Sequence, residues 1–143
     1  MMDEREPIHA IAAFFNAIVA GQLDEVTAMY RRSATTYVFV EGPRWSTLGY
    51  DQIAAGWRAY LESPIRITGW QWGEGPVVEV WNDGAIVAGL LDLDVRVDGK
   101  PRALRFRASF VLRCDESGRW RMIHEHLSQP MTDPYGIGDW LTP

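Results

Sequence analysis

Residues 85–128 read AIVAGLLDLDVRV, DGKP, RALRFRASFVLRC, DESG and RWRMIHEHLS, and this stretch decides the fold. Three runs of alternating apolar and polar residues are separated by turn residues, which predicts antiparallel strands over 85–97, 103–113 and 120–128. Such strands are longer than the usual length of about five or six residues, so the sheet must twist and curl. Gly89, inside the first run, is the expected position of a bend or bulge.

The residues before this stretch extend the pattern toward the N-terminus. Residues 65–72 and 77–81 predict two further strands, and the β-rich residues 35–41 predict an earlier one. Apolar residues recur at three- and four-residue steps in three segments, which predicts helices over about 7–20, 23–30 and 50–62. Helices followed by antiparallel strands indicate an α+β fold, with three helices packed on a strongly curved sheet. Straight helices cannot fill such a sheet completely, so we expect an internal cone-shaped cavity.

Length and composition exclude several classes of protein. The chain has 143 residues and a net charge of −5, which is typical of one globular domain over 1–143. No apolar run reaches the roughly 18 residues that a membrane span requires, and MMDEREP does not resemble a signal peptide. The sequence contains no cluster of Lys and Arg residues of the kind that binds nucleic acid phosphates. The single cysteine, Cys114, forms no intramolecular disulfide, and we expect a cytoplasmic protein.

Several segments resemble a known superfamily. The opening FFNAIVAGQLD (14–24), the ATTY of 34–37 and a helix after Gly49 resemble the nuclear-transport-factor-2-like (NTF2-like) superfamily. The ending SFVLR (109–113) and GRWRMIHEHLS (118–128), with Pro130, is similar to its SnoaL-like branch, and also to the association (hub) domain of calcium/calmodulin-dependent kinase II. This resemblance implies a helix-capped curved sheet with a deep pocket, and a homodimer formed through the outer face of the sheet. Activities vary widely in this superfamily, so the fold does not fix the function.

The last two predicted strands carry a group of polar residues that we call the polar patch. His124 and His126 lie two residues apart, so their side chains leave the same face of a strand. If Trp120 lies opposite Arg113 and no bulge intervenes, His124 lies opposite Ser109 and His126 opposite Arg107. The polar patch is then Arg107, Ser109, His124, His126 and Ser128. It can line the cavity or meet water, and we take it to face the cavity, with His126 as a candidate base and Arg107 as an oxyanion binder.

Asp92 is the other candidate base, because it interrupts an apolar strand. A buried unpaired carboxylate is costly, so Asp92 is paired, solvated or tuned for proton transfer. We expect it to meet Arg107 across the sheet, and an ion pair without chemistry is the simpler alternative. In the hub domains that this chain resembles, a pocket-lining arginine occupies the matching position. A nucleophile triad of Ser109, His124 and Asp92 is not expected, because no strained elbow motif accompanies the serine.

Aromatic residues concentrate in the first strand, the loop after it, the third helix and the next strand. In an NTF2-like fold these elements surround the mouth of the cavity, which implies an apolar, cyclic or aromatic ligand. A bulky aromatic core is the alternative. The ligand-binding candidates in this part of the chain are Tyr37, Trp45, Trp57 and Tyr60, together with Ser109 and His124 of the polar patch.

Ketosteroid isomerase chemistry is tested by three positions that the resemblance supplies. The oxyanion tyrosine of those enzymes falls on Phe15, which has no donor. The base falls near Val38, or on Glu41 if a gap is allowed, and the protonated aspartate falls near Ser109. We therefore do not expect that mechanism.

The two histidines also raise the question of a metal. Two imidazoles on one strand face can share an ion, but a site needs a third ligand. Asp92, Glu79 and His9 follow no recognised spacing, so we expect no metal and no cofactor.

These observations leave more than one function open. The first is a small-molecule enzyme of the SnoaL-like kind that shuttles a proton without a cofactor, as an isomerase, cyclase or dehydratase would. The second is a noncatalytic carrier that uses the same cavity, and the third is an assembly module like the kinase hub. We expect a small-molecule ligand, no nucleic acid or membrane partner, and a homodimer.

Overall fold

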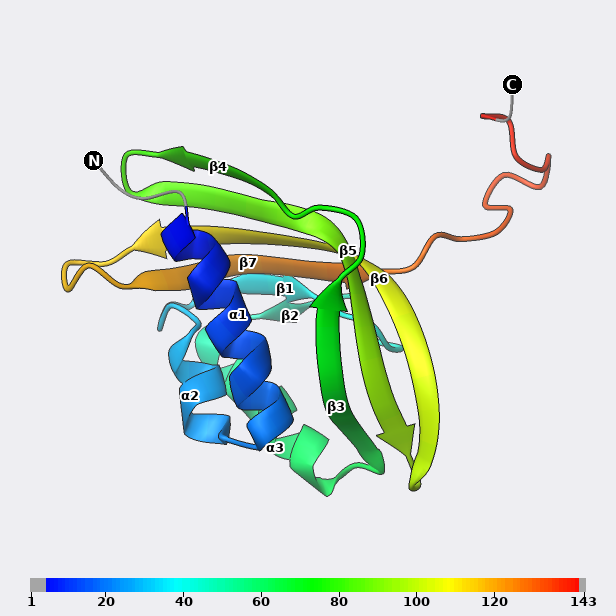
Figure 1. Cartoon of the computed structure of the whole chain (residues 1–143), viewed down its shortest axis with the longest axis horizontal. Coiled ribbons are helices and arrows are strands. Elements are labelled where there is room, and N and C mark those ends of the chain that lie inside the picture. The colour runs from blue at the N-terminus through cyan, green and yellow to red at the C-terminus, as the bar shows by residue number, and fades with distance from the viewer. Residues whose placement is uncertain (1–4, 142–143) are drawn as a thin grey trace.

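The structure is a computed structural model that describes residues 5–141. Its helices are α1 (Arg5–Ala20), α2 (Leu23–Ala28) and α3 (Tyr50–Glu62). Its strands are β1 (Tyr37–Phe39), β2 (Thr47–Leu48), β3 (Ile65–Trp72), β4 (Val77–Trp81), β5 (Gly84–Val97), β6 (Lys100–Cys114) and β7 (Trp120–Ser128). The α+β architecture with helices against one side of a curled, open sheet is the predicted one (Figure 1).

Within residues 5–141 the strands form a seven-stranded sheet in the order β2-β1-β7-β6-β5-β3, with β4 also paired to β5. All pairs are antiparallel except β1 and β7, which run parallel. The long strands β5 and β6 curve together toward the end of the sheet that holds β3 (Figure 1). This curvature separates the sheet from the helices over part of its length and makes room for a cavity.

Gly89 marks the point on β5 where its partner changes. Residues 84–88 of β5 pair with β4, and residues 91–97 pair with β3. Between them the 73–76 segment crosses close to β5, where Leu90 N–H donates to the Glu74 carbonyl at 2.8 Å. A Cβ atom on Gly89 would lie 2.6 Å from that carbonyl oxygen, so only glycine fits this crossing. The β5–β6 register runs through Gly89 without a shift, so no bulge lies at this position, and glycine is required there by the close backbone approach instead.

The helices cover the concave face of the sheet. α1 buries the apolar stripe that its sequence period predicts, and Phe14 and Phe15 are at most 2% exposed. The even-numbered residues of β6, Phe106, Phe110 and Leu112, are also buried and belong to the same core cluster. Edge-to-face ring contacts join the two layers, as between Phe15 and Phe110 at 5.9 Å.

Most element boundaries follow the sequence pattern. α3, β3, β4 and β7 have the predicted bounds, whereas β1 is shorter than predicted at both ends, since residues 34–35 form a turn, the Thr36 hydroxyl donates to the Arg31 carbonyl at 2.7 Å, and the chain bends at residues 41–43. β2 was not predicted, since two residues carry no periodicity. Residues 129–141 extend away from the sheet (Figure 1). In the described part of the chain, no helix combines the length and apolar character that crossing a membrane requires.

Candidate active site in the cavity

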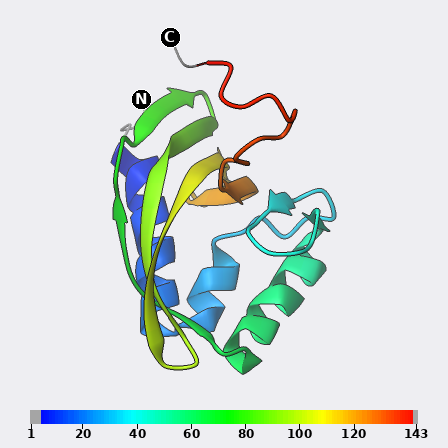
Figure 2. The same ribbon diagram turned by 90° about the vertical axis from the view of Figure 1, so that its right-hand side faces the viewer.

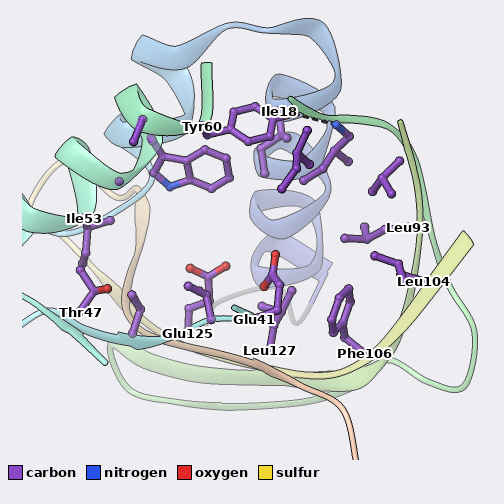
Figure 3. Close-up of a pocket in the computed structure, with 18 of the residues that line it drawn as sticks. Ile18, Glu41, Thr47, Ile53, Tyr60, Leu93, Leu104, Phe106, Glu125 and Leu127 are labelled. Atoms are coloured by element: carbon purple, nitrogen blue, oxygen red, sulfur yellow. Dashed lines mark hydrogen bonds between the residues drawn. The ribbon is translucent and has the colours of Figure 1, made fainter. Parts of the chain in front are cut away.

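A cavity of about 540 Å³ lies between the helices and the concave face of the sheet. Its walls come from α1, the end of α2, α3, β1, the segment after β1, and strands β3, β5, β6 and β7 (Figure 3). Most of the lining is apolar, with Phe14, Ile18 and Phe106 among the deep residues. A space of this size and character suits a small, largely apolar molecule.

The cavity contains one fully buried carboxyl group, that of Glu125 on β7. Glu125 is 3% exposed, and its carboxyl group projects into the cavity (Figure 3). The Tyr30 hydroxyl donates to Glu125 Oε1 at 2.6 Å, and Trp57 Nε1 donates to the Tyr30 oxygen at 3.2 Å. This chain of hydrogen bonds, from α3 through the end of α2 to β7, holds the carboxyl in place. Among the described residues, Glu125 Oε2 accepts no hydrogen bond, so this oxygen is free to meet a ligand.

Burial changes the acidity of these groups. The pKa of Glu125 is raised to about 8, mainly because burial removes its hydration; the hydrogen bond from Tyr30 lowers the pKa, and the nearby Glu41 carboxylate raises it. Burial also raises the pKa of Tyr30 well above its ordinary value, and the Glu125 charge adds to this. Glu125 is therefore mostly protonated at neutral pH and can act as a hydrogen-bond donor or an acid.

Glu41, in the segment after β1, supplies a second carboxyl group to the same cavity (Figure 3). Enclosure by the cavity walls raises its pKa, although the residue remains accessible to water through the opening. Because Glu41 is more accessible than Glu125, it loses its proton first. The site thus combines a protonated carboxyl and an ionisable one, the usual arrangement for paired acid and base catalysis.

Two of the predicted ligand-binding residues line the cavity. Trp57 and Tyr60, both on α3, project into it, with their rings in edge contact at 5.4 Å. The backbone N–H of Ile67 donates to the Tyr60 hydroxyl at 2.7 Å, which fixes this ring against β3. The two other aromatic candidates are not part of the lining: Trp45 is 97% exposed, and Tyr37 is 37% exposed on the opposite face of the sheet.

The polar patch does not face the cavity, and that expectation was wrong. Arg107, Ser109, His124, His126 and Ser128 are absent from the lining, whereas Glu125 and Leu127 are present. On β6 the apolar even-numbered residues face the helices and the cavity, so Arg107 and Ser109, on the alternate face, point outward. On β7 a β-bulge brings the histidines to this same outer face: Leu112 pairs with Met122 and Val111 pairs with His124, so Ile123 is an extra residue. An extra residue inverts the alternation of all side chains that follow. Trp120 and Met122 face the core, but the histidines after the bulge face outward.

The cross-strand partners within the polar patch also differ from the expected ones, because Trp120 lies opposite Cys114 instead of Arg113 and the bulge adds one more residue. His126 lies opposite Ser109, and Arg107 lies opposite Ser128 instead of His126. The Arg107 guanidinium donates to Ser128 Oγ at 3.0 and 3.2 Å and to the Gln129 carbonyl at 3.2 Å. His124 Nδ1 lies 2.6 Å from the Tyr37 carbonyl. Neither His126 nor Arg107 is placed to act on a molecule in the cavity.

Asp92 is likewise on the outer face, and its partner differs from the expected Arg107. It lies directly opposite Arg105, whose Nε and Nη2 donate to the two carboxylate oxygens at 2.6 and 3.0 Å. The Arg105 guanidinium lowers the pKa of Asp92, which keeps the carboxylate ionised. Asp92 is thus an ion-paired surface residue, the alternative that the sequence left open.

The three positions taken from ketosteroid isomerases have different outcomes. Phe15 lines the cavity with a ring that offers no donor, and Ser109 faces the other side of the sheet. Glu41, the gapped choice for the base, does line the cavity. The hydroxyl of the site comes from Tyr30 at the end of α2, and the protonated carboxyl comes from Glu125 on β7.

Sequence reasoning missed Glu125 because it assigned this residue to the outer face. The available signal was a glutamate flanked by Ile123 and Leu127, an acidic residue within an otherwise apolar alternation. In the described part of the chain, no group of three His, Cys, Asp or Glu residues is close enough to hold a metal ion.

Solved structures of known proteins share this fold. An NTF2-like superfamily protein from Salmonella enterica serovar Typhimurium LT2 matches with a TM-score of 0.77 and 20% identity over 94% of this chain and 96% of that one. A ketosteroid isomerase-like protein from Erwinia carotovora atroseptica matches with a TM-score of 0.71 and 18% identity over 90% of this chain and 100% of its own.

A third structure, from Thiobacillus denitrificans, is described as a candidate calcium/calmodulin-dependent protein kinase type II association domain. It has a TM-score of 0.68 and 24% identity over 87% of this chain and 95% of that one. Identities this low establish the shared fold alone. Among curated proteins, none matches this chain. The family model for the SnoaL-like domain, however, matches residues 8–132, and the chain therefore belongs to the SnoaL-like family within the NTF2-like fold.

Proposed function

We propose that this protein is a cofactor-independent enzyme that moves a proton on a small, largely apolar molecule bound in the cavity. The observation that carries the proposal is the Glu125 carboxyl, buried in an apolar cavity, held through one oxygen by Tyr30 and open to a ligand through the other. A buried carboxyl is costly for the fold, and a polar group placed at such a cost is commonly functional.

The pair of carboxyl groups supports a concerted role in the shift of a double bond. A ligand carbonyl oxygen accepts a proton from Glu125, while Glu41 removes a proton from the adjacent carbon. In a β,γ-unsaturated ketone, the C–H bond at the α-carbon breaks as the O–H bond of a neutral dienol forms. Glu41 then returns its proton to the γ-carbon, the C=C bond moves to the α,β position, and the dienol O–H proton goes back to Glu125 as the carbonyl re-forms. The sequence of steps consumes no cofactor and regenerates both groups.

Exchange of carbon-bound hydrogen tests the proposal without knowledge of the natural substrate. The bicyclic ketone 1-indanone is incubated with the protein in D2O, and deuterium incorporation next to the carbonyl is followed by NMR. We expect exchange above that of buffer, and a loss of about a hundredfold in Glu41→Gln and Glu125→Gln, because general acid–base catalysis contributes roughly 10²–10⁴-fold.

Asp92→Asn is the matched control, since it removes a carboxylate from the outer face of the same sheet. It should leave the exchange rate unchanged. Equal loss in this variant and in Glu125→Gln would contradict a role for the cavity carboxyls. Binding of 1-indanone without any exchange would identify a carrier and overturn the enzymatic proposal.

A further inference from the structure

Two arginines lie at the opening of the cavity, Arg44 in the segment between β1 and β2 and Arg102 on β6. Both belong to the lining, and both are exposed. Arg102 shares the inner face of β6 with Leu104 and Phe106, which places it at the outer end of that wall. The two segments that carry the arginines, the β1–β2 connection and the β5–β6 hairpin, stand on opposite sides in Figure 2, with α3 below the first.

Neither of these guanidinium groups has a partner among the described residues, since no hydrogen bond or ion pair involves either one. This distinguishes them from the arginines on the outer face, where Arg105 binds Asp92 and Arg107 binds Ser128. Arginine offers five donors in a planar fork that matches carboxylate, sulfate or phosphate oxygens. Unpaired arginines at a cavity opening therefore provide a ready binding position for an anionic group.

The charges of the cavity are arranged in two zones. Glu125 lies in the buried part with Glu41 beside it. Among the residues that the structure describes, no positive charge lowers the pKa of either carboxyl group. The guanidinium groups of Arg44 and Arg102 thus stay apart from the carboxyls instead of neutralising them. The whole chain carries a net charge of −5, so attraction of an anion has to come from a local feature of this kind.

Building on the proposed function, we infer that the molecule bound in the cavity is an amphiphilic anion. Its carboxylate, sulfate or phosphate group lies at the opening between Arg44 and Arg102, its apolar body fills the cavity, and its uncharged polar end meets Glu125. A cationic ligand would be repelled by the two unpaired guanidinium groups at the opening. A ligand with a second negative charge would place that charge next to the carboxyl groups of Glu41 and Glu125, which repel it.

A pair of fluorescent probes tests this inference. 1-Anilinonaphthalene-8-sulfonate and N-phenyl-1-naphthylamine share one aromatic body and differ only in the sulfonate. We expect the sulfonate probe to bind more tightly to the native protein, and its Kd to rise about tenfold in the double variant Arg44→Gln/Arg102→Gln, since each solvated charge contact contributes a few-fold. The Kd of the uncharged probe should not change in this variant.

Two controls make the outcome specific. Arg58→Gln removes an exposed α3 arginine that is not part of the cavity lining, and it should leave both Kd values unchanged. Leu104→Trp, which fills the cavity from β6, should weaken both probes. If the uncharged probe binds and the double variant leaves the sulfonate probe unaffected, the inference is overturned while binding in the cavity stands. If neither probe binds the native protein, the inference is overturned as well, and the proposed function is then decided separately by the exchange of 1-indanone.

Discussion

Glu125 shows how the position of one residue decides the chemistry of this protein. Its neighbours His124 and His126 carry the more familiar catalytic side chains, but they face outward and contact the ring of Phe39 at 5.1 and 5.5 Å. Glu125 instead points into an apolar space where, within residues 5–141, Tyr30 alone donates a hydrogen bond in place of its lost hydration. The same burial that makes it a candidate acid also makes it a burden on stability.

The stability of the protein should therefore depend on pH through Glu125. The folded-state pKa is raised to about 8 from 4.5, so between these values the folded protein keeps a proton that the unfolded chain releases. The contribution of Glu125 to the free energy of unfolding is largest below pH 4.5. It falls as the pH rises toward about 8, by up to about 1.4 kcal/mol per pH unit. Glu125→Gln cannot ionise and keeps the acceptor for Tyr30, so it should gain stability relative to the native protein from pH 5 to 8. Urea unfolding at several pH values measures this, and parallel curves for the two proteins would contradict it.

Single irregularities within strands determine what the elements can do. The bulge at Ile123 lies where β7 exchanges its partner: Met122 bonds with Met29 and Arg31, and residues 124–126 pair with β1. The bulge aligns these two pairings and turns Glu125 inward. On β5, Gly89 permits the crossing of the 73–76 segment at the junction between the β4 and β3 pairings.

Substitution of glycine by alanine should have opposite effects in two elements. Gly89→Ala places a methyl group 2.6 Å from a backbone carbonyl oxygen, so we expect a loss of about 1–3 kcal/mol in the free energy of unfolding. Gly56→Ala, in α3, meets no atom within 4 Å and should gain about 0.5–1 kcal/mol through helix propensity. Chemical denaturation of both variants measures the difference. A neutral Gly89→Ala would show that the crossing is not tightly packed.

At the scale of the whole molecule, the sheet presents two unlike faces. The concave face holds the helices and the cavity, while the convex face carries the polar patch, the Asp92–Arg105 ion pair and the aromatic contact of Tyr37 with Phe39 at 4.9 Å. Separation of these faces means that assembly through the convex face would leave the cavity unobstructed.

We propose that two copies of the chain pair through this convex face, as the family resemblance implies. Val111→Arg, which places a charge in the middle of the face, should convert the dimer to a monomer in sedimentation velocity experiments. Val19→Arg, a comparable change on the helical side, should leave the assembly intact. A native protein that sediments as a monomer at all concentrations would contradict the proposal.

The elements of this protein follow from its sequence because their signals are local. Alternation over 65–72 and 120–128 and the helical period of 50–62 depend on neighbouring residues only, and the turn residues between strands complete the fold class. The assignment of Trp57 and Tyr60 to the cavity came from the family resemblance, and both residues line it.

Only the tertiary structure decided which face of β7 lines the cavity. Alternation along a strand specifies two sets of side chains but does not say which set faces inward, and one inserted residue exchanges them. The Ile123 bulge arises from the need of β7 to pair with residues 29–31 and with β1, which are far away in the sequence. Pairing between distant segments leaves no local pattern, and so Glu125, Tyr30 and Glu41 come together as a site only when the chain is folded.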